Sequence, residues 1–123
     1  MGLWDSLFNR KPKPGRPVEV TDETFESLVL CSSIPVVVDF WSSRCGPCQV
    51  MGGLLNELGP DFVDRVAIFK LNVDDNWETA RKYGVSSVPT LVLLRNGRVV
   101  DNLVGLIPLN PLRDRLEQLA RGR

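Results

Sequence analysis

The stretch PVVVDFWSSRCGPC, residues 35–48, determines most of what can be predicted about this fold. Its first half, residues 35–41, is a run of β-branched and aromatic side chains, which is typical of a strand buried on both faces of a central sheet. Cys45 and Cys48 follow directly, and the next residues predict a helix over about residues 47–58. The cysteine pair therefore lies where a buried strand ends and a helix begins.

This position of the cysteine pair favours thiol chemistry. A helix N-terminus presents unpaired N–H groups and about half a positive charge, so it stabilises the thiolate form of a cysteine, which is the form that attacks disulfides. Cys45 lies at the start of the predicted helix, with Cys48 one turn further and within bonding reach. Cys45 can attack a substrate disulfide, and Cys48 can then attack Cys45 to release the reduced substrate. Gly46 permits close approach of a partner backbone, and Pro47 begins the helix without the loss of a hydrogen bond.

A Cys-x-x-Cys pair has two other interpretations, half of a zinc site and a structural bridge. Zinc takes four ligands, usually from two such pairs or from histidines, whereas this chain has no histidine and only Cys31 as a third cysteine. We therefore expect no metal site. Without histidine, acid–base work at neutral pH falls to cysteine, carboxylate, lysine or water.

The sequence around this stretch predicts an α/β fold. Strands are expected over residues 18–20, 66–73, 90–95 and 98–104, and Asn96-Gly97 between the last two predicts an antiparallel hairpin. Helices are expected from an N-cap at Thr21 to about Cys31, over residues 76–83, and from an N-cap at Asn110 with Pro111 at the first position. The order is βαβαβ, then a β-hairpin and a C-terminal helix, which gives a mixed central sheet with helices on both faces.

Length and charge bound the class of protein. The chain has 123 residues, of which 43% are apolar, so one domain with a single core is expected. Its 15 basic and 15 acidic residues cancel, and we expect no nucleic-acid binding because no net field attracts a polyanion.

The first 17 residues are predicted to be an N-terminal extension and tether, with the domain over residues 18–123. KPKPGRP (residues 11–17) disfavours a helix, and residues 1–9 place Leu3, Trp4, Leu7 and Phe8 on one side of a short amphipathic segment. The start fits the Met-Gly-x-x-x-Ser myristoylation pattern, although the segment can also pack on its own domain. We do not expect membrane contact through residues 1–9. The extension lacks an unbroken apolar signal region, so a cytoplasmic location is predicted.

VDFWSSRCGPC, KLNVDDN, YGVSSVPTLVLLRNG and VG together resemble the thioredoxin family over residues 18–120. The resemblance implies the thioredoxin fold and a dithiol that reduces disulfides in protein substrates. It also implies recharging by a thioredoxin reductase or a similar donor, with electrons from NADPH, and no bound cofactor. We expect the protein to be a monomer.

Carried over by position, Cys45 resembles the family's nucleophile and Cys48 its resolving thiol. Asp39 resembles the buried aspartate behind the disulfide, suited to take the Cys48 proton through a water, and Lys70 resembles the partner of that aspartate. A buried Asp39–Lys70 ion pair without a catalytic role is the alternative.

Five further positions are matched to the active-site region of the family. Pro89 after Val88 resembles the cis-proline that turns backbone toward the disulfide, although a proline that merely begins a strand is the alternative. Trp41 resembles the tryptophan beside the active-site loop, and core packing would suit it equally well. Val104 and Gly105 are expected to line the substrate groove.

Three features depart from the family or lie outside its pattern. Arg44 replaces the usual tryptophan before the first cysteine; at ~7 Å its attraction for the Cys45 thiolate is about 0.6 to 2 kcal/mol, which favours acidic targets unless solvent screens it. Gly52 and Gly53 cost the helix about 2 kcal/mol against alanine and are expected to keep a bend or allow tight packing. Cys31 is predicted to be a buried, inert thiol, with a regulatory or dimer-forming thiol as the alternative. A specialised oxidoreductase or a docking module dedicated to one partner is the rival function.

Overall fold

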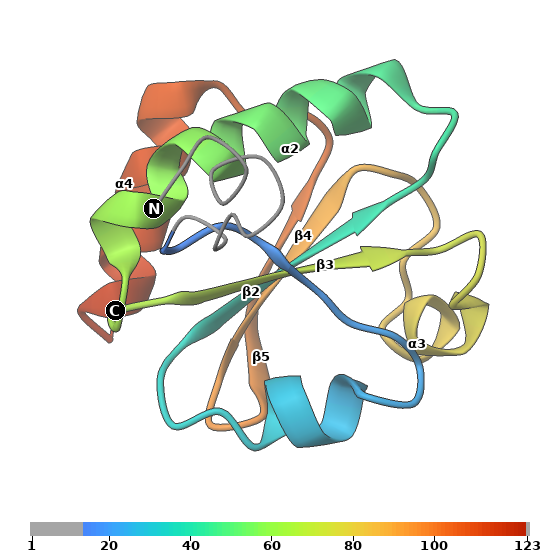
Figure 1. Cartoon of the computed structure of the whole chain (residues 1–123), viewed down its shortest axis with the longest axis horizontal. Helices are drawn as coiled ribbons and strands as arrows, with labels where there is room; N and C mark the ends of the chain where they lie inside the picture. The colour runs from blue at the N-terminus through green and yellow to red at the C-terminus, as the bar shows by residue number, and fades with distance from the viewer. Residues whose placement is uncertain (1–13, 123) are drawn as a thin grey trace, which may run out of the picture.

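The computed structural model describes residues 14–122, and these contain one five-stranded mixed sheet (Figure 1). The strand order is β1-β3-β2-β4-β5. β1, β2 and β3 are parallel, whereas β4 runs antiparallel to β2, and β5 antiparallel to β4. The strands are β1 Val18–Glu19, β2 Val36–Trp41, β3 Ala67–Asn72, β4 Thr90–Arg95 and β5 Arg98–Val104. The predicted α/β class, mixed sheet and strand positions are confirmed, with ends that shift by one residue.

The helices lie on both faces of the sheet, as predicted. α2 and α4 cover one face and contribute to a core cluster with Leu55, Leu116 and Leu91. The five-residue helix η1 and α3 cover the other face and pack with Val38 and Phe40. Figure 1 shows this three-layer arrangement. The bounds are η1 Glu26–Leu30, α2 Gly46–Leu58, the 3-10 turn η2 Gly59–Phe62, α3 Trp77–Lys82 and α4 Leu109–Ala120.

The alternation of side chains along β2 determines which face of the sheet carries its acidic residue. Val37 packs in the cluster under α2 and α4, whereas Val36 and Val38 pack in the opposite cluster. Because successive side chains of a strand point to opposite faces, Asp39 and Trp41 lie on the same side as Val37, under α2. The strand thus directs its one acid toward the helix that begins at the cysteines.

The hairpin between β4 and β5 forms at the predicted dipeptide. Asn96 and Gly97 have φ values of 53° and 75°, the left-handed conformation that both central residues of a type I′ turn require. Arg95 and Arg98 are the last residue pair of the two strands. The sequence signal and the observed turn agree.

The start of α4 differs from the prediction. The helix begins at Leu109 with Pro108 as its N-cap, so Asn110 is not the cap, and no side-chain hydrogen bond closes this end. The N–H of Leu112 donates to the carbonyl of Pro108 at 3.0 Å, so the first helical turn begins two residues before the predicted cap. Pro111 fits inside the first turn because N–H groups there have no helical partner. The predicted apolar stripe of Leu112, Leu116 and Leu119 is buried.

The first helix is shorter than predicted. The Thr21 hydroxyl accepts from the N–H of Thr24 at 3.3 Å and the Thr21 carbonyl accepts from the N–H of Phe25 at 3.0 Å, so Thr21 caps the first turn as predicted. The regular part is a wide helix over Glu26–Leu30, in which the Cys31 N–H donates to Glu26 O at 3.2 Å. Asp22, in the turn before η1, accepts from the Thr79 N–H at 2.9 Å and from the Thr79 hydroxyl at 2.6 Å in α3.

The predicted tether contacts the domain at its last residues. Gly15, at φ +85°, lies so close to the backbone of Gly59 that a Cβ on either glycine would collide with the other's carbonyl group. The chain therefore crosses the end of α2 at a fixed point, and the boundary after residue 17 stays a prediction. The apolar set in residues 1–9 and the myristoylation pattern lie outside the described residues. No helix within residues 14–122 has the length and apolarity to cross a bilayer.

Candidate active site

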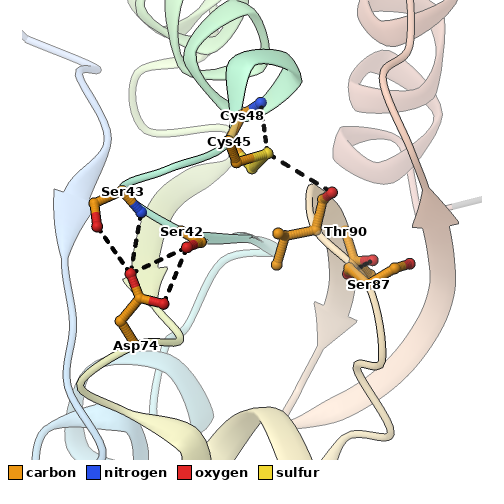
Figure 2. The surroundings of a disulfide bond; sticks show 8 residues. Ser42, Ser43, Cys45, Cys48, Asp74, Ser87 and Thr90 are labelled. Atoms are coloured by element: carbon orange, nitrogen blue, oxygen red, sulfur yellow. Dashed lines mark hydrogen bonds between the residues drawn. A yellow bond between two sulfur atoms is a disulfide. The ribbon is translucent and has the colours of Figure 1, made fainter.

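The cysteine pair forms a disulfide at the N-terminus of α2. Cys45 is the N-cap residue, and its Sγ accepts from the Cys48 N–H at 3.2 Å (Figure 2). The two Cα atoms are 5.2 Å apart. Cys45 is partly exposed, whereas Cys48 is only 3% exposed. The helix end therefore gives a hydrogen bond to the sulfur that solvent reaches and covers the other sulfur.

The segment before β4 lies against this disulfide. The Val88–Pro89 peptide bond is cis, and the Val88 carbonyl oxygen lies 3.8 Å from Cys45 Sγ. The Gly105 N–H donates to the Pro89 carbonyl at 2.8 Å, which joins the residue after β5 to the same segment. Val104 is 70% exposed at the edge of this region. The structure therefore brings Val88, Pro89, Val104 and Gly105 together near the disulfide, and the substrate groove that they are expected to line stays a prediction.

Asp39 and Lys70 face each other on neighbouring strands. They are register partners in β2 and β3, and both line a cavity of about 280 Å³ that also reaches Cys48. Burial raises the pKa of Asp39 from 3.8 to about 7, although the positive charge of Lys70 opposes this shift. No salt bridge within 4.0 Å joins these two described side chains. The predicted alternative, a buried ion pair, is therefore not what the structure contains.

Two residues that line this cavity each have a polar atom without a hydrogen-bond partner among the described residues. These atoms are Asp39 Oδ1 and Trp41 Nε1, both buried. Trp41 is the last residue of β2 and lines the same cavity, so it lies beside the active-site loop and also contributes to packing. Buried polar atoms of this kind are normally satisfied by protein or ordered water. The cavity behind the disulfide is thus polar at its base.

The loop between β2 and the cysteines is held by a carboxylate that the sequence analysis missed. Asp74 accepts from the Ser42 hydroxyl at 3.0 Å, from the Ser43 hydroxyl at 2.9 Å and from the Ser43 N–H at 3.2 Å (Figure 2). These hydrogen bonds, the Ser43 N–H first, lower the pKa of Asp74, and the charge of Arg44 adds to the effect. The ends of parallel neighbouring strands meet at one sheet edge, and this signal would have pointed to Asp74 after β3.

Arg44 itself is exposed, as its position in the loop before Cys45 predicts. The positive charge of Arg44 also acts on the Asp74 carboxylate. The negative charge of Asp74 therefore offsets part of the charge of Arg44. Gly46 and Pro47 are exposed in the first turn of α2. This leaves the N-terminal end of α2 open to a partner's backbone.

One prediction about the remaining unusual residues is wrong, and of the two alternatives for the glycines one is excluded while the bend stays a prediction. Cys31, the residue that follows η1, is an exposed free thiol and not a buried one. Gly52 and Gly53 do not allow tight packing, since a Cβ on either would meet no atom within 4 Å. Within residues 14–122 no three potential metal ligands cluster.

The chain is similar in sequence to known proteins over most of its length. The family model described as Thioredoxin matches residues 16–118. The chain is 45% identical to thioredoxin from Haemophilus influenzae, over 82% of this chain and 94% of that protein. It is 40% identical to thioredoxin 2 from Chlorobaculum tepidum, over 85% and 95%. It is 42% identical to thioredoxin 1 from Synechococcus elongatus, over 80% and 92%.

Proposed function

Because this chain belongs to the thioredoxin family and is a protein-disulfide reductase that works by dithiol–disulfide exchange, we propose that Cys45 is its attacking thiolate and Cys48 its resolving thiol. The observation that carries this assignment is the N-cap position of Cys45, whose sulfur is partly exposed and accepts the Cys48 N–H. A hydrogen bond and a helix N-terminus stabilise negative charge on that sulfur. Cys48, 3% exposed, reaches a substrate only through Cys45.

The reaction has two exchange steps. The Cys45 thiolate attacks one sulfur of a substrate disulfide, forms a mixed disulfide and releases the other substrate sulfur as thiolate. The Cys48 sulfur then attacks Cys45, the Cys45–Cys48 bond forms, and the second substrate sulfur leaves. Two electrons pass to the substrate, and the Cys48 proton must go to a base.

Asp39 is the proposed acceptor of the Cys48 proton. Both residues line one cavity, and burial raises the pKa of Asp39 to about 7, so near neutral pH the carboxyl group can both take up and release a proton. Lys70 across the strand pair opposes this rise in pKa, and its proposed role is to keep part of the Asp39 population charged. No direct contact between Asp39 and Cys48 is needed, because a water can relay the proton.

We further propose a substrate surface of Val88, Pro89, Val104 and Gly105, with Trp41 and Arg44 beside it. The backbone of Val88 lies next to Cys45 Sγ, so an extended substrate segment can hydrogen bond there as an added strand. Exposed Val104 offers an apolar contact. Arg44 gives this surface a positive charge, which favours acidic segments near the target disulfide.

Reduction of insulin tests the function. With dithiothreitol as electron source, the protein should accelerate precipitation of the insulin B chain well above the reagent alone. Cys45→Ser should abolish the acceleration. Cys48→Ser should instead accumulate a mixed disulfide with the substrate, visible as an added mass. A mixed disulfide that accumulates in Cys48→Ser but not in Cys45→Ser would support the assigned order of attack. The reverse pattern would contradict it.

The electron donor and location belong to the same proposal. A monomeric cytoplasmic protein, recharged from NADPH by a thioredoxin reductase, fits the family and its disulfide-containing protein substrates. Recycling by a purified reductase is the test: NADPH oxidation should be continuous with insulin present. Failure of recycling, with insulin reduction by dithiothreitol intact, would favour the rival function of an oxidoreductase dedicated to one partner, which Arg44 before the cysteine motif suggests.

A further inference from the structure

The cavity behind the disulfide reaches the surface along the flank of α2. At its base lie Asp39, which is 3% exposed, and Cys48. At its rim lie three exposed residues of α2, Gln49, Gly53 and Asn56. We propose that Gly52 and Gly53 form a window through which Asp39 exchanges protons with solvent while a substrate covers Cys45. This inference rests on the proposed role of Asp39.

The glycines keep this route open because they lack side chains. A Cβ built on Gly52 or on Gly53 meets no heavy atom within 4 Å, so the space beside them is not filled by any neighbouring group. Any longer side chain would project from α2 into or across this space. The absence of side chains at Gly52 and Gly53 therefore leaves the cavity open along the flank of α2.

The interior of the cavity is suited to water. Asp39, Trp41 and Lys70 line it and supply polar and charged groups. Asp39 Oδ1 and Trp41 Nε1 are buried and lack partners among the described residues. A water site needs about 10–15 Å³ and two to four polar partners, so a cavity of about 280 Å³ accommodates a chain of waters. Such a chain connects the Asp39 carboxyl group to the polar rim of Gln49 and Asn56.

The window lies away from the substrate surface. Gly52 follows Cys45 by seven positions, which along a helix corresponds to about 10 Å. The substrate surface of Val88, Pro89 and Gly105 adjoins the sulfur of Cys45 at the N-terminus of α2. A substrate bonded to Cys45 therefore covers that end and leaves the flank near Gly52 and Gly53 in contact with solvent.

The route completes the proton balance of the second exchange step. The Cys48 thiol passes its proton to the Asp39 carboxylate, the Cys48 sulfur bonds to Cys45, and the substrate sulfur leaves as thiolate. Asp39 then releases the proton through the waters to solvent. The titratable groups that face Asp39 are Lys70 on β3 and Cys48 on α2, whereas β4 places Leu91 opposite it.

The test closes the window with a helix-forming side chain. In Gly52→Leu the side chain lies over the preceding turn, toward Cys48 and Gln49, and further buries Asp39. If this burial raises the Asp39 pKa by about one unit, the charged fraction at pH 7 falls from about one half to one tenth. We expect resolution of the mixed disulfide with a fluorescent peptide to slow about fivefold at pH 7. The midpoint of its pH profile should rise, and the rate above pH 9 should be unchanged.

Three variants make the result decisive. Glu57→Leu, on an exposed position of α2 that does not line the cavity, should keep the wild-type rate and midpoint. Gly53→Leu repeats the test if Gly52→Leu folds poorly. Combined with Asp39→Asn, Gly52→Leu should cause no further slowing, because the window acts through Asp39.

The possible failures are distinguishable. A wild-type profile in both leucine variants would overturn the window and leave the reductase function intact. Equal slowing with and without Asp39→Asn would show that the leucine displaces Cys48, which also overturns it. If Asp39→Asn alone left the profile unchanged, the proposed role of Asp39 as proton acceptor would be the part that fails.

Discussion

Replacing Asp39 by asparagine should stabilise the oxidised protein, and the gain should depend on pH. Burial raises the pKa of this carboxyl group from 3.8 to about 7 in the folded state. The folded protein therefore holds this proton more tightly than the unfolded chain. The contribution of Asp39 to the free energy of unfolding is thus most favourable below about pH 4 and falls as the pH rises toward 7. Asparagine has a similar shape and no charge at any pH, so it removes this loss.

The size of the effect follows from the pKa difference. Each unit of difference corresponds to about 1.4 kcal/mol, and the shift to about 7 is roughly three units. The free energy of unfolding of wild type should thus fall by up to ~4 kcal/mol between pH 4 and pH 8, relative to the variant. Water that solvates the carboxylate through the cavity reduces this figure, which is an upper limit.

Urea denaturation of both proteins at pH 3.5, 5.5 and 8, with the disulfide intact, measures the difference. We expect near-equal midpoints at pH 3.5 and a clear advantage of Asp39→Asn at pH 8. The exposed Glu23 provides a control, because Glu23→Gln removes a carboxylate without removing a buried charge. Parallel pH dependences of wild type and Asp39→Asn would refute the reasoning, since they would mean that folding does not change the proton affinity of Asp39.

Further substitutions test other contacts. Gly52→Ala and Gly53→Ala should each raise the free energy of unfolding by about 1 kcal/mol in thermal or urea unfolding, because a helical Cβ there meets open space; a loss would show a strained site. Asp22→Ala should lower the free energy of unfolding by about 1–2 kcal/mol, because two Thr79 donors lose their acceptor. Asp22→Asn should lose less stability because the amide oxygen can still accept, and equal losses in the two variants would contradict a hydrogen-bonding role. Arg44→Gln should slow reduction of acidic disulfide peptides and flatten the salt dependence of that rate in stopped-flow assays, and an unchanged salt slope would rule out electrostatic selection.

The strands and their succession along the chain were predictable because their signals are local. The β-branched run of β2 and the Asn96-Gly97 turn depend on neighbouring residues, and both appear as expected. Helix starts were less predictable. Asn110 has the side chain of a good cap, yet the structure uses Pro108, whose carbonyl already accepts the first helical hydrogen bond. Where two adjacent starts differ by little energy, side-chain preference does not decide between them.

The parts of the site that sequence did not reveal all depend on contacts between distant segments. Asp74 holds Ser42 and Ser43 across 32 and 31 positions of chain, respectively, and only the shared edge of the parallel strands, not a sequence motif, indicates such a bond. The openness beside Gly52 depends on what β2 and β3 leave unfilled. Cys31 was expected to be buried because cysteines usually are, but its local turn exposes it. Spacing identifies reactive residues, whereas their surroundings require the assembled fold.

The contact between Gly15 and Gly59 has a consequence for the delivery of the reactive thiol. α2 runs for 13 residues from beside Cys45 to Leu58, about 20 Å, and Gly15 touches the chain just beyond its far end. Whatever is attached ahead of Gly15, a natural anchor or an engineered fusion, is therefore joined at the opposite end of this helix from the disulfide.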